Sequence, residues 1–310
     1  MLDIFLTPDL YNSAIRLTCP LALAALGGLI SEKAGVLNMS LEGYMLMGAF
    51  CAYFGSLYSG NPYIGLLFGA LGGGALAVLH AFFSITVRVN QIVVALGLNM
   101  LALGFTSTQY RLAFGINQMQ QACTGLNTVP LGPLANIPVL GPILFQQNIM
   151  FYVILLLVPL ISYLFKKTSW GLAIQAAGEH PRALDVAGIN VLRVRYLSVM
   201  ASGLIAGIGG ATLILSGLNN FFDDITSGKG FIAFSAIVFG KWMPLPVVLA
   251  TLLFGFFDAF QLRLQALGGS IVPYQLFLVL PYATTLVALW IVGASKGPAA
   301  SGSAYSRENG

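Results

Sequence analysis

The sequence predicts an all-α membrane protein: a polytopic helical bundle of about eight to ten spans, each with the roughly 20 residues that cross a bilayer. Two observations predict this class. Of the 310 residues, 57% are hydrophobic and only 8% are charged, against about 25% charged in an ordinary soluble domain. No residue between Glu42 and Arg88 carries a formal charge. Lipid is therefore the predicted environment of the chain.

The predicted spans follow one another with short polar breaks between them. The turn-like stretch "YSGNPY" divides the uncharged run into two helices. The stretch 230–241 is shorter than the others, and whether it crosses the membrane is left open. Residues 1–295 are expected to form one transmembrane domain, followed by a Gly/Ser-rich, disordered tail at 296–310. We predict spans near residues 13–31, 40–58, 62–87, 91–113, 147–166, 197–217, 230–241, 243–264 and 273–293.

The positively charged residues predict the orientation of these spans. With the first span running from outside to inside, ten Lys and Arg residues lie in the cytoplasm and four lie outside or near it, as the positive-inside rule favours. The loop 166–196 is then cytoplasmic, and the uncharged loop 114–146 is extracytoplasmic. Gln, Asn, Gly and Pro in the latter favour turns and rigid extended pieces. It is either a docking surface or only a connection, and both interpretations remain open.

The loop 166–196 contains a specific local pattern. Pro181 is typical of a first helical turn and Gly188 of a helix end, so "PRALDVA" is predicted to be a helix of about two turns. A second helix, "SWGLAIQAA", precedes it and ends at Gly178. Two short helices joined by "GEHP" form a compact cytoplasmic knob. The alternative is an interfacial hairpin that merely connects two spans.

Motifs for catalysis are missing or out of place. No G-x-x-x-x-G-K-[ST] occurs, so the chain is not expected to bind ATP phosphates itself. The match to G-x-S-x-G, "GASKG", lies where a span meets the tail, without the strand–turn–helix setting of a nucleophile. His80 and His180 are too few and too far apart for a zinc site or a triad. We expect no catalytic residue, no metal site, no cofactor and no nucleic-acid partner.

Polar residues within the predicted spans are candidates for a solute path. Intramembrane ionisable groups usually face a cavity or pair inside the bundle, which would place Asn38 and Glu42 on such a path. The competing interpretation is structural: Asn38 or Ser40 caps the next helix, and Glu42 is stabilised in its first turn by the helix dipole. Glu32 and Lys33, at the cytoplasmic end of the first span, are expected to reach water.

Asp258 is the second acid of this kind. With Gln261 at i+3 it makes a polar stripe on an aromatic-rich helix, a surface suited to a purine and a ribose. The alternative is an internal pair with Arg263 or with another helix. Asn99 and Gln109 on the fourth span are similar candidates for the path.

Four longer stretches carry a resemblance that is more specific than these short patterns. They are "SEKAGVLNMSLEGYMLMGAF", "AAGEHPRALDVAGINVLRVRYLSVMASGLIAGIGGA", "GKGFIAFSAIVFGKWMPL" and "PYQLFLVLPYATTLVAL". In this order, they resemble the permease subunits of bacterial ABC importers in the branched-chain amino acid, simple sugar and nucleoside group. The nearest branch is that of the nucleoside permeases that work with a Bmp-type lipoprotein. The resemblance implies the type II importer permease fold and a location in the cytoplasmic membrane.

By this resemblance, the knob is the pair of coupling helices that sits in a groove of a separate ABC ATPase subunit, where ATP is hydrolysed. The resemblance also implies a second, paralogous permease in a heterodimer, and an extracytoplasmic substrate-binding lipoprotein. The residues implied in the contact with the ATPase are Gly178, Glu179, His180, Pro181, Arg182, Ala183, Ala187 and Gly188.

The function that the resemblance implies is nucleoside import driven by the ATPase. A permease for simple sugars or a related small polar solute is the nearest alternative, because the group shares these motifs. A stand-alone ion-coupled carrier or channel is an alternative of a different class. It would need an intramembrane ion site, for which only Glu42 and Asp258 are available, and it would not need the knob. A membrane-embedded enzyme is disfavoured because paired catalytic groups are missing.

Overall fold

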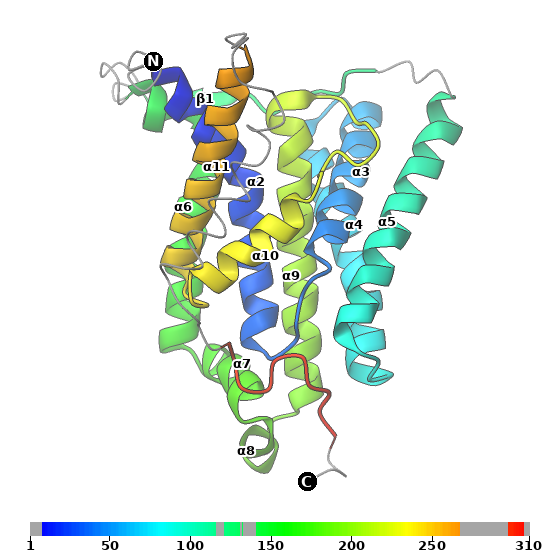
Figure 1. Cartoon of the computed structure of the whole chain (residues 1–310), viewed down its shortest axis with the longest axis vertical. Helices are drawn as coiled ribbons and strands as arrows, with labels where there is room; N and C mark the ends of the chain where they lie inside the picture. The colour runs from blue at the N-terminus through cyan, green and yellow to red at the C-terminus, as the bar shows by residue number, and fades with distance from the viewer. Residues whose placement is uncertain (1–7, 116–120, 131, 133–140, 267–296, 307–310) are drawn as a thin grey trace.

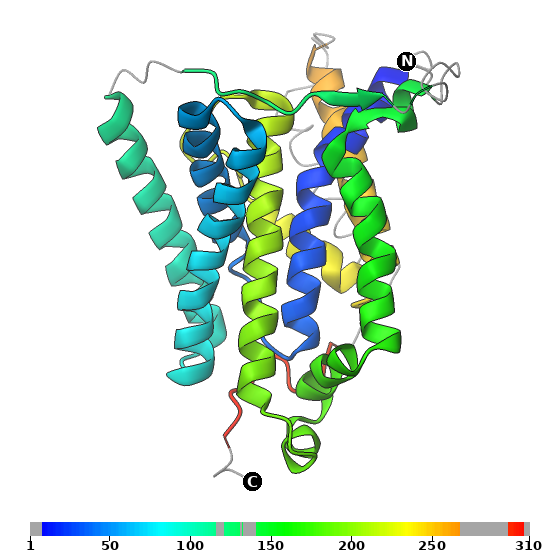
Figure 2. The same ribbon diagram turned by 180° about the vertical axis from the view of Figure 1, so that it is seen from behind.

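The computed structural model describes residues 8–115, 121–130, 132, 141–266 and 297–306. Within these ranges, helices of 19 residues or more run between the two ends of an elongated bundle (Figures 1 and 2). Two of them continue as single π-helical turns, η1 after α4 and η4 after α9. The long helices are α2 (Pro8–Lys33), α3 (Leu41–Ser59), α4 (Pro62–Ala81) with η1 (Phe82–Thr86), α5 (Gln91–Phe114), α6 (Ile149–Lys167), α9 (Val191–Leu213) with η4 (Ile214–Leu218), and α11 (Pro244–Ala266).

The two ends of the bundle carry different short elements. At the knob end lie α7 (Ser169–Glu179) and α8 (Pro181–Val186), and at the loop end lie β1 (Thr128–Pro130) and β2 (Gln146–Asn148). The chain passes back and forth between these ends, because α2 descends to the knob end and α3 returns toward the loop end (Figure 1).

Helices that can span a bilayer account for most of the described chain. Six of them are long and apolar enough to cross a membrane, so the described part is a polytopic all-α membrane bundle, as predicted. The predicted span 40–58 is indeed the helix α3, but α3 is not one of these six. The segment 230–241 is α10 (Lys229–Phe239), whose 11 residues are too few to cross. The predicted span 273–293 lies outside the described residues.

The interior of the bundle is built on α2, α3 and α9, most of whose residues are buried. Glycines allow α9 to approach α4 closely, as small residues do between membrane helices. An added Cβ at Gly73 would lie 2.7 Å from the Cα of Gly207, and one at Gly203 would lie 2.7 Å from the carbonyl oxygen of Gly73. The two backbones therefore touch, and a larger residue at these positions would push the helices apart.

The helices α5 and α6 stand at opposite edges of the bundle (Figures 1 and 2). Both present large apolar side chains to the outside: Met100 and Leu112 on α5 are 74% and 75% exposed, and Leu156 on α6 is 68% exposed. Apolar surface of this kind is covered by lipid or by another subunit in a membrane protein.

Two non-helical segments interrupt the bundle between its ends. The first break, residues 34–40, joins α2 to α3, and the second break, residues 219–228, leads from η4 back into the bundle to α10. Figure 1 shows α10 slanting across the bundle, away from both ends. Non-helical backbone at membrane depth is tolerated only where protein buries it or where it lines a water-filled cavity. The two breaks therefore need polar partners from the surrounding helices.

The loop at the loop end contains the extended pieces that its composition predicts. Strand β1 pairs antiparallel with β2, in a register that places Val129 opposite Gln147, and the π-helical turn η3 (Gly141–Phe145) precedes β2. The neighbouring segment 121–130 lies across the helix ends (Figure 2). There the Tyr53 hydroxyl donates to the carbonyl of Gln121 at 2.8 Å, and the Leu126 amide donates to the carbonyl of Leu215 at 2.6 Å.

The C-terminal segment differs from the expectation of a disordered tail at 296–310. Its described part, residues 297–306, lies against the knob end of the bundle (Figures 1 and 2). Pro298 is buried, and the Ala300 amide donates to the carbonyl of Gly178 at 2.8 Å. A polar, Gly/Ser-rich composition favours disorder only where no contacts offset the entropy of ordering the chain. Backbone hydrogen bonds, which composition does not reveal, supply such contacts here.

Candidate functional site

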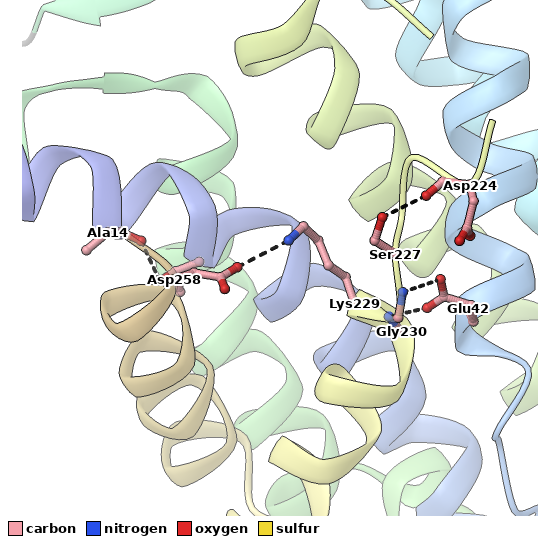
Figure 3. A network of polar contacts seen from close by, with 9 residues as sticks. Ala14, Glu42, Asp224, Ser227, Lys229, Gly230 and Asp258 are labelled. Atoms are coloured by element: carbon pink, nitrogen blue, oxygen red, sulfur yellow. Dashed lines mark hydrogen bonds and ion pairs between the residues drawn. The ribbon is translucent and has the colours of Figure 1, made fainter. Parts of the chain in front are cut away.

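Glu42 lies where α3 and the second break meet, and its side chain is 8% exposed. Its carboxylate accepts three hydrogen bonds, two from the end of the second break and one from the first turn of α10. Figure 3 shows Glu42 beside Gly230. The Thr226 hydroxyl and the Gly228 amide donate to Oε1 at 2.5 and 2.9 Å, and the Gly230 amide donates to Oε2 at 2.6 Å. Each donor lies more than 180 residues away along the chain.

These contacts make Glu42 the anionic cap of α10. The first amides of a helix have no partner within the helix, and a carboxylate there is favoured by both hydrogen bonding and the helix dipole. The second break needs this support because Asp224, Ser227 and Gly228 adopt left-handed backbone angles, which strain a non-glycine residue. One of the two predictions placed Glu42 in the first turn of α3, where it lies, but neither prediction identified the contact with α10.

Asp258 contacts the start of the same helix, α10, from the side opposite Glu42. Its Oδ2 lies 3.2 Å from the Nζ of Lys229, the first residue of α10, and both side chains are 20% exposed. Figure 3 shows Glu42 and Asp258 reaching α10 from α3 and α11. Asp258 is therefore in an internal pair with another helix, as one of the two predictions held, and its partner is Lys229 on α10. Gln261, on the next turn of α11, is buried.

Asn38 holds the first break against two long helices. Its Nδ2 donates to the Ser31 hydroxyl on α2 at 2.9 Å and to the Ser202 hydroxyl on α9 at 2.8 Å, while its amide donates to Oε1 of Glu32 at 2.7 Å. The predicted N-cap position is right, because Ser40 is the N-cap residue of α3, but neither Ser40 nor Asn38 caps that helix through its side chain. The expectation for Glu32 is wrong. Glu32 is 1% exposed and does not reach water, because the first break needs its carboxylate.

The cap that α3 needs is supplied by another helix. Asn99 on α5 accepts from the Gly43 amide at 2.9 Å through Oδ1 and donates to the Met39 carbonyl at 3.0 Å through Nδ2. Gln91, which the sequence analysis missed, accepts from the Leu37 amide at 2.8 Å. Its position at the start of a span was the only available signal, and it does not identify a partner.

The structure thus brings together some of the predicted path residues and separates another. Asn38, Glu42 and Asn99 surround the first break and the start of α3, and Asp258 meets Glu42 across the start of α10. Gln109 lies ten residues beyond Asn99, about 15 Å along α5, and its side chain is exposed. The inner residues share the property that they hold a break or a helix start in place: Asn38 ties the first break to α2 and α9, Asn99 binds the start of α3, and Glu42 and Asp258 bind the start of α10.

The knob has the helices that the sequence predicts. Helix α7 ends at Glu179 and α8 runs from Pro181 to Val186, while Gly188 adopts a φ of +85° after the helix end. Val186 is 90% exposed, so α8 presents an apolar side chain to the outside. Most of the residues predicted to contact an ATPase share this exposure: Glu179, His180, Arg182, Ala183, Ala187 and Gly188.

Gly178 differs from the rest of that set because it is buried. An added Cβ on Gly178 would lie 3.1 Å from the amide nitrogen of Gly35 and closer still to the carbonyl oxygen of Lys33. Gly35 has a φ of +81° and is the second residue of the first break. The end of α7 therefore packs directly on the first break, and the absence of side chains makes this contact possible.

Comparison with known proteins identifies the family of the chain. Residues 10–289 match the family model described as branched-chain amino acid transport system / permease component. The chain belongs to this permease family. No solved structure matches it.

The relatives of this family member carry transport names. The guanosine ABC transporter permease protein NupQ of Bacillus subtilis is 36% identical, over 92% of this chain and 92% of its own length. The nucleoside ABC transporter permease protein NupC of Lactococcus lactis is also 36% identical, over 92% and 93%. The putative glucose ABC transporter permease protein TsgC13 of Haloferax volcanii is 36% identical, over 85% and 80%.

These findings establish the class of the protein. It is a multi-pass integral protein of the cytoplasmic membrane and the permease of an ABC importer, which is not itself an enzyme and which works with an ATPase and a substrate-binding protein. Two weaker relatives come from the same organisms as the first two: NupP of B. subtilis, named as a guanosine permease, and NupB of L. lactis, named as a nucleoside permease, each 25% identical.

Proposed function

We propose that the chain translocates nucleosides. The observation that carries this proposal is the pair of relatives named for guanosine and nucleosides, which match over nine-tenths of both chains. The relative named for glucose is equally identical but shares less of its length.

Uptake by the complete transporter tests the substrate. Proteoliposomes with the cognate binding protein are given labelled guanosine, adenosine, uridine, ribose or glucose, and the same assay without the binding protein is the control. We expect nucleoside uptake that depends on the binding protein, with little uptake of ribose or glucose. A preference for either sugar would contradict the proposal and favour the sugar branch of the family.

We infer that the first and second breaks line the path of the solute through the permease. Asn38, Glu42 and Asn99 hold the first and second breaks in place, while Asp258, Gln261 and Gln109 offer polar groups to the solute. Variants of the first set are expected to lose stability and uptake together. Variants of Gln261 and Gln109 are expected to change the Michaelis constant for uptake while the melting temperature stays close to that of the wild type. Variants of Asp258 are expected to change both, because Asp258 also pairs with Lys229.

For coupling, we propose that α7 and α8 sit in a groove of the ATPase subunit, which hydrolyses the ATP. The exposed Val186, with Ala183 and Ala187 beside it, offers an apolar contact. Ala187→Asp and Gly188→Pro are expected to abolish nucleoside-stimulated ATPase activity, because a new charge or a lost backbone donor spoils a packed contact. Asp9→Asn, which changes an exposed acid outside both the knob and the loop 114–146, is the control. Normal stimulation in both knob variants would contradict the coupling role.

We propose that the chain pairs with a paralogous permease in a heterodimer. We also propose that an extracytoplasmic lipoprotein docks on the loop 114–146 and that the assembly has the type II permease fold. The occurrence of two matching permeases in B. subtilis and in L. lactis supports pairing with a paralogue. The apolar outer faces of α5 and α6 are available for it. An active complex that contains this permease alone would contradict the heterodimer.

Cysteine labelling tests the orientation. In a background without Cys19, Cys51 and Cys123, an impermeant thiol reagent added to intact cells is expected to label Ala122→Cys at the loop end and to spare Ala183→Cys in the knob. The reverse pattern would invert the orientation. Disrupted cells, in which both positions are expected to react, provide the control for accessibility.

A further inference from the structure

Residues 297–306, here named the C-terminal strap, contact four separate parts of the knob end. The Ala299 amide donates to Oε2 of Glu179 at 3.3 Å, and the Ala300 amide donates to the Gly178 carbonyl at 2.8 Å, so two bonds go to the end of α7. The Gly302 amide donates to the carbonyl of Gly35 in the first break at 3.3 Å. The strap thus bridges the knob and the first break (Figures 1 and 2).

Two further contacts fasten the other half of the strap. The Tyr305 hydroxyl donates to Oδ2 of Asp185 in α8 at 3.0 Å. Arg195 on α9 is 2% exposed, and its guanidinium donates to the carbonyls of Ser303 at 2.8 Å and of Ala177 at 3.2 Å. A buried guanidinium is costly unless its donors are satisfied, so Arg195 ties the strap to α7 and gains acceptors from both.

The strap also begins next to the partners of the first break. An added Cβ at Gly297 would lie 2.9 Å from the indole ring of Trp242, in the turn between α10 and α11. That indole nitrogen donates to Oε2 of Glu32 at 3.4 Å, and Oε1 of Glu32 accepts from the Asn38 amide. Contacts therefore run without interruption from α8 through the strap to both sides of the first break.

We propose that the C-terminal strap is a positioning element. It fixes the α7–α8 pair against the first break, with Arg195 as its anchor, so that a displacement of the pair is passed to the break. This inference rests on the coupling role proposed for α7 and α8. It adds that coupling needs residues 297–306, a segment whose composition resembles a dispensable tail.

A pair of proline variants tests the strap in the complete transporter. Ala300→Pro removes the donor to Gly178, whereas Ala304→Pro changes an exposed alanine of the strap whose amide donates no hydrogen bond among the described residues. Loss of one such bond, about 1 kcal/mol, corresponds to a roughly fivefold effect. We expect Ala300→Pro to lower the solute transported per ATP hydrolysed by about that factor, and Ala304→Pro to leave this ratio near the wild-type value.

Substitutions of the anchor test the same contact from α9. Arg195→Met is expected to lower the transport ratio further than Ala300→Pro, because it removes the bonds to both Ser303 and Ala177. Arg195→Lys keeps the charge and can reach one of the two carbonyls, so partial rescue is expected. A role limited to folding would instead reduce the amount of assembled, monodisperse complex and leave the ratio in the remaining complex unchanged.

A second readout separates this inference from the proposed function. Trypsin cleavage after Arg182, an exposed residue of α8, is measured on the purified permease without ATP or solute. Ala300→Pro is expected to speed this cleavage about fivefold over Ala304→Pro, since release of one bond of about 1 kcal/mol frees the knob. If the wild type imports no nucleoside, the proposed function fails while cleavage still tests the strap. Equal cleavage in the two variants, or faster cleavage with an unchanged transport ratio, would overturn the strap.

Discussion

Glu42 and Asp258 are two carboxylates that hold the same helix start, and they do so through different kinds of partner. Glu42 binds backbone amides and a hydroxyl of the second break, while Asp258 binds the side chain of Lys229. Two of the three donors to Glu42 are peptide amides, which every residue type except proline would present there, and the third is the Thr226 hydroxyl. The contact of Asp258 depends on one side chain, which can be replaced together with its partner.

This difference indicates which of the two carboxylates, Glu42 or Asp258, the fold needs more. Removing Glu42 leaves peptide groups unpaired, and no second substitution can remove those groups. Removing Asp258 leaves an ammonium unpaired, and a second substitution at Lys229 can correct that. We therefore expect every substitution of Glu42 to destabilise the fold. Lys229 and Asp258, in contrast, can be replaced together with a smaller loss of stability.

The largest effect is expected for Glu42→Ala. Each buried donor left without an acceptor costs about 1–3 kcal/mol, and three donors lose theirs, against a total stability of about 5–15 kcal/mol for a typical folded protein. The variant should yield little monodisperse permease after detergent extraction. Asp9→Asn, which removes an exposed acid, is the control. A Glu42→Ala protein with wild-type melting temperature would refute the capping role.

The next effect concerns Lys229 and Asp258. Breaking a buried pair costs about 3–5 kcal/mol, and exposure of 20% for both side chains reduces this to roughly 1–3 kcal/mol by solvent screening. Lys229→Met and Asp258→Leu should each lower the melting temperature, and the double variant should recover most of the loss. A double variant no better than the worse single variant would show that the two residues act separately.

A loss of comparable size is expected for Asn99→Ala, which removes one acceptor and one donor at the start of α3. Two neutral hydrogen bonds contribute about 1–3 kcal/mol in total. Asn99→Asp keeps the acceptor for the Gly43 amide and loses only the donor to Met39, so it should lie between Ala and the wild type in thermal unfolding. The reverse order would mean that the bond to Met39 is the more important one.

The smallest effect on stability is expected for Gln109→Ala. An exposed side chain of this kind usually changes stability by less than about 0.5 kcal/mol. If Gln109 contacts the solute, the Michaelis constant for uptake rises while the melting temperature is unchanged. Gln91→Ala, which removes the acceptor for Leu37, is the opposite case on the same helix and should lower the melting temperature. An unchanged Michaelis constant for Gln109→Ala would remove Gln109 from the path.

Much of the helical framework could be predicted because its signals are local. Hydrophobic length located α2, α4, α5 and α6, and the pairing of Pro181 with Gly188 located α8. The acid at position 42 was also recognised as unusual. What binds it could not be predicted, because the donors lie in a turn on the far side of the sequence and peptide amides carry no signature of their own. The order of residues 297–306 escaped prediction for the same reason.

The modest hydrophobicity of α3 has a consequence for how the protein is made. This helix carries Glu42, is 19 residues long and is mostly buried, yet it is not among the six helices that are apolar enough to span on their own. While ribosomes deliver the chain, α3 has no neighbours except α2, because α4, α5 and α9 are synthesised later. Its stable insertion therefore waits for those helices, and the nascent chain passes through a stage in which α3 has left the ribosome without its final surroundings.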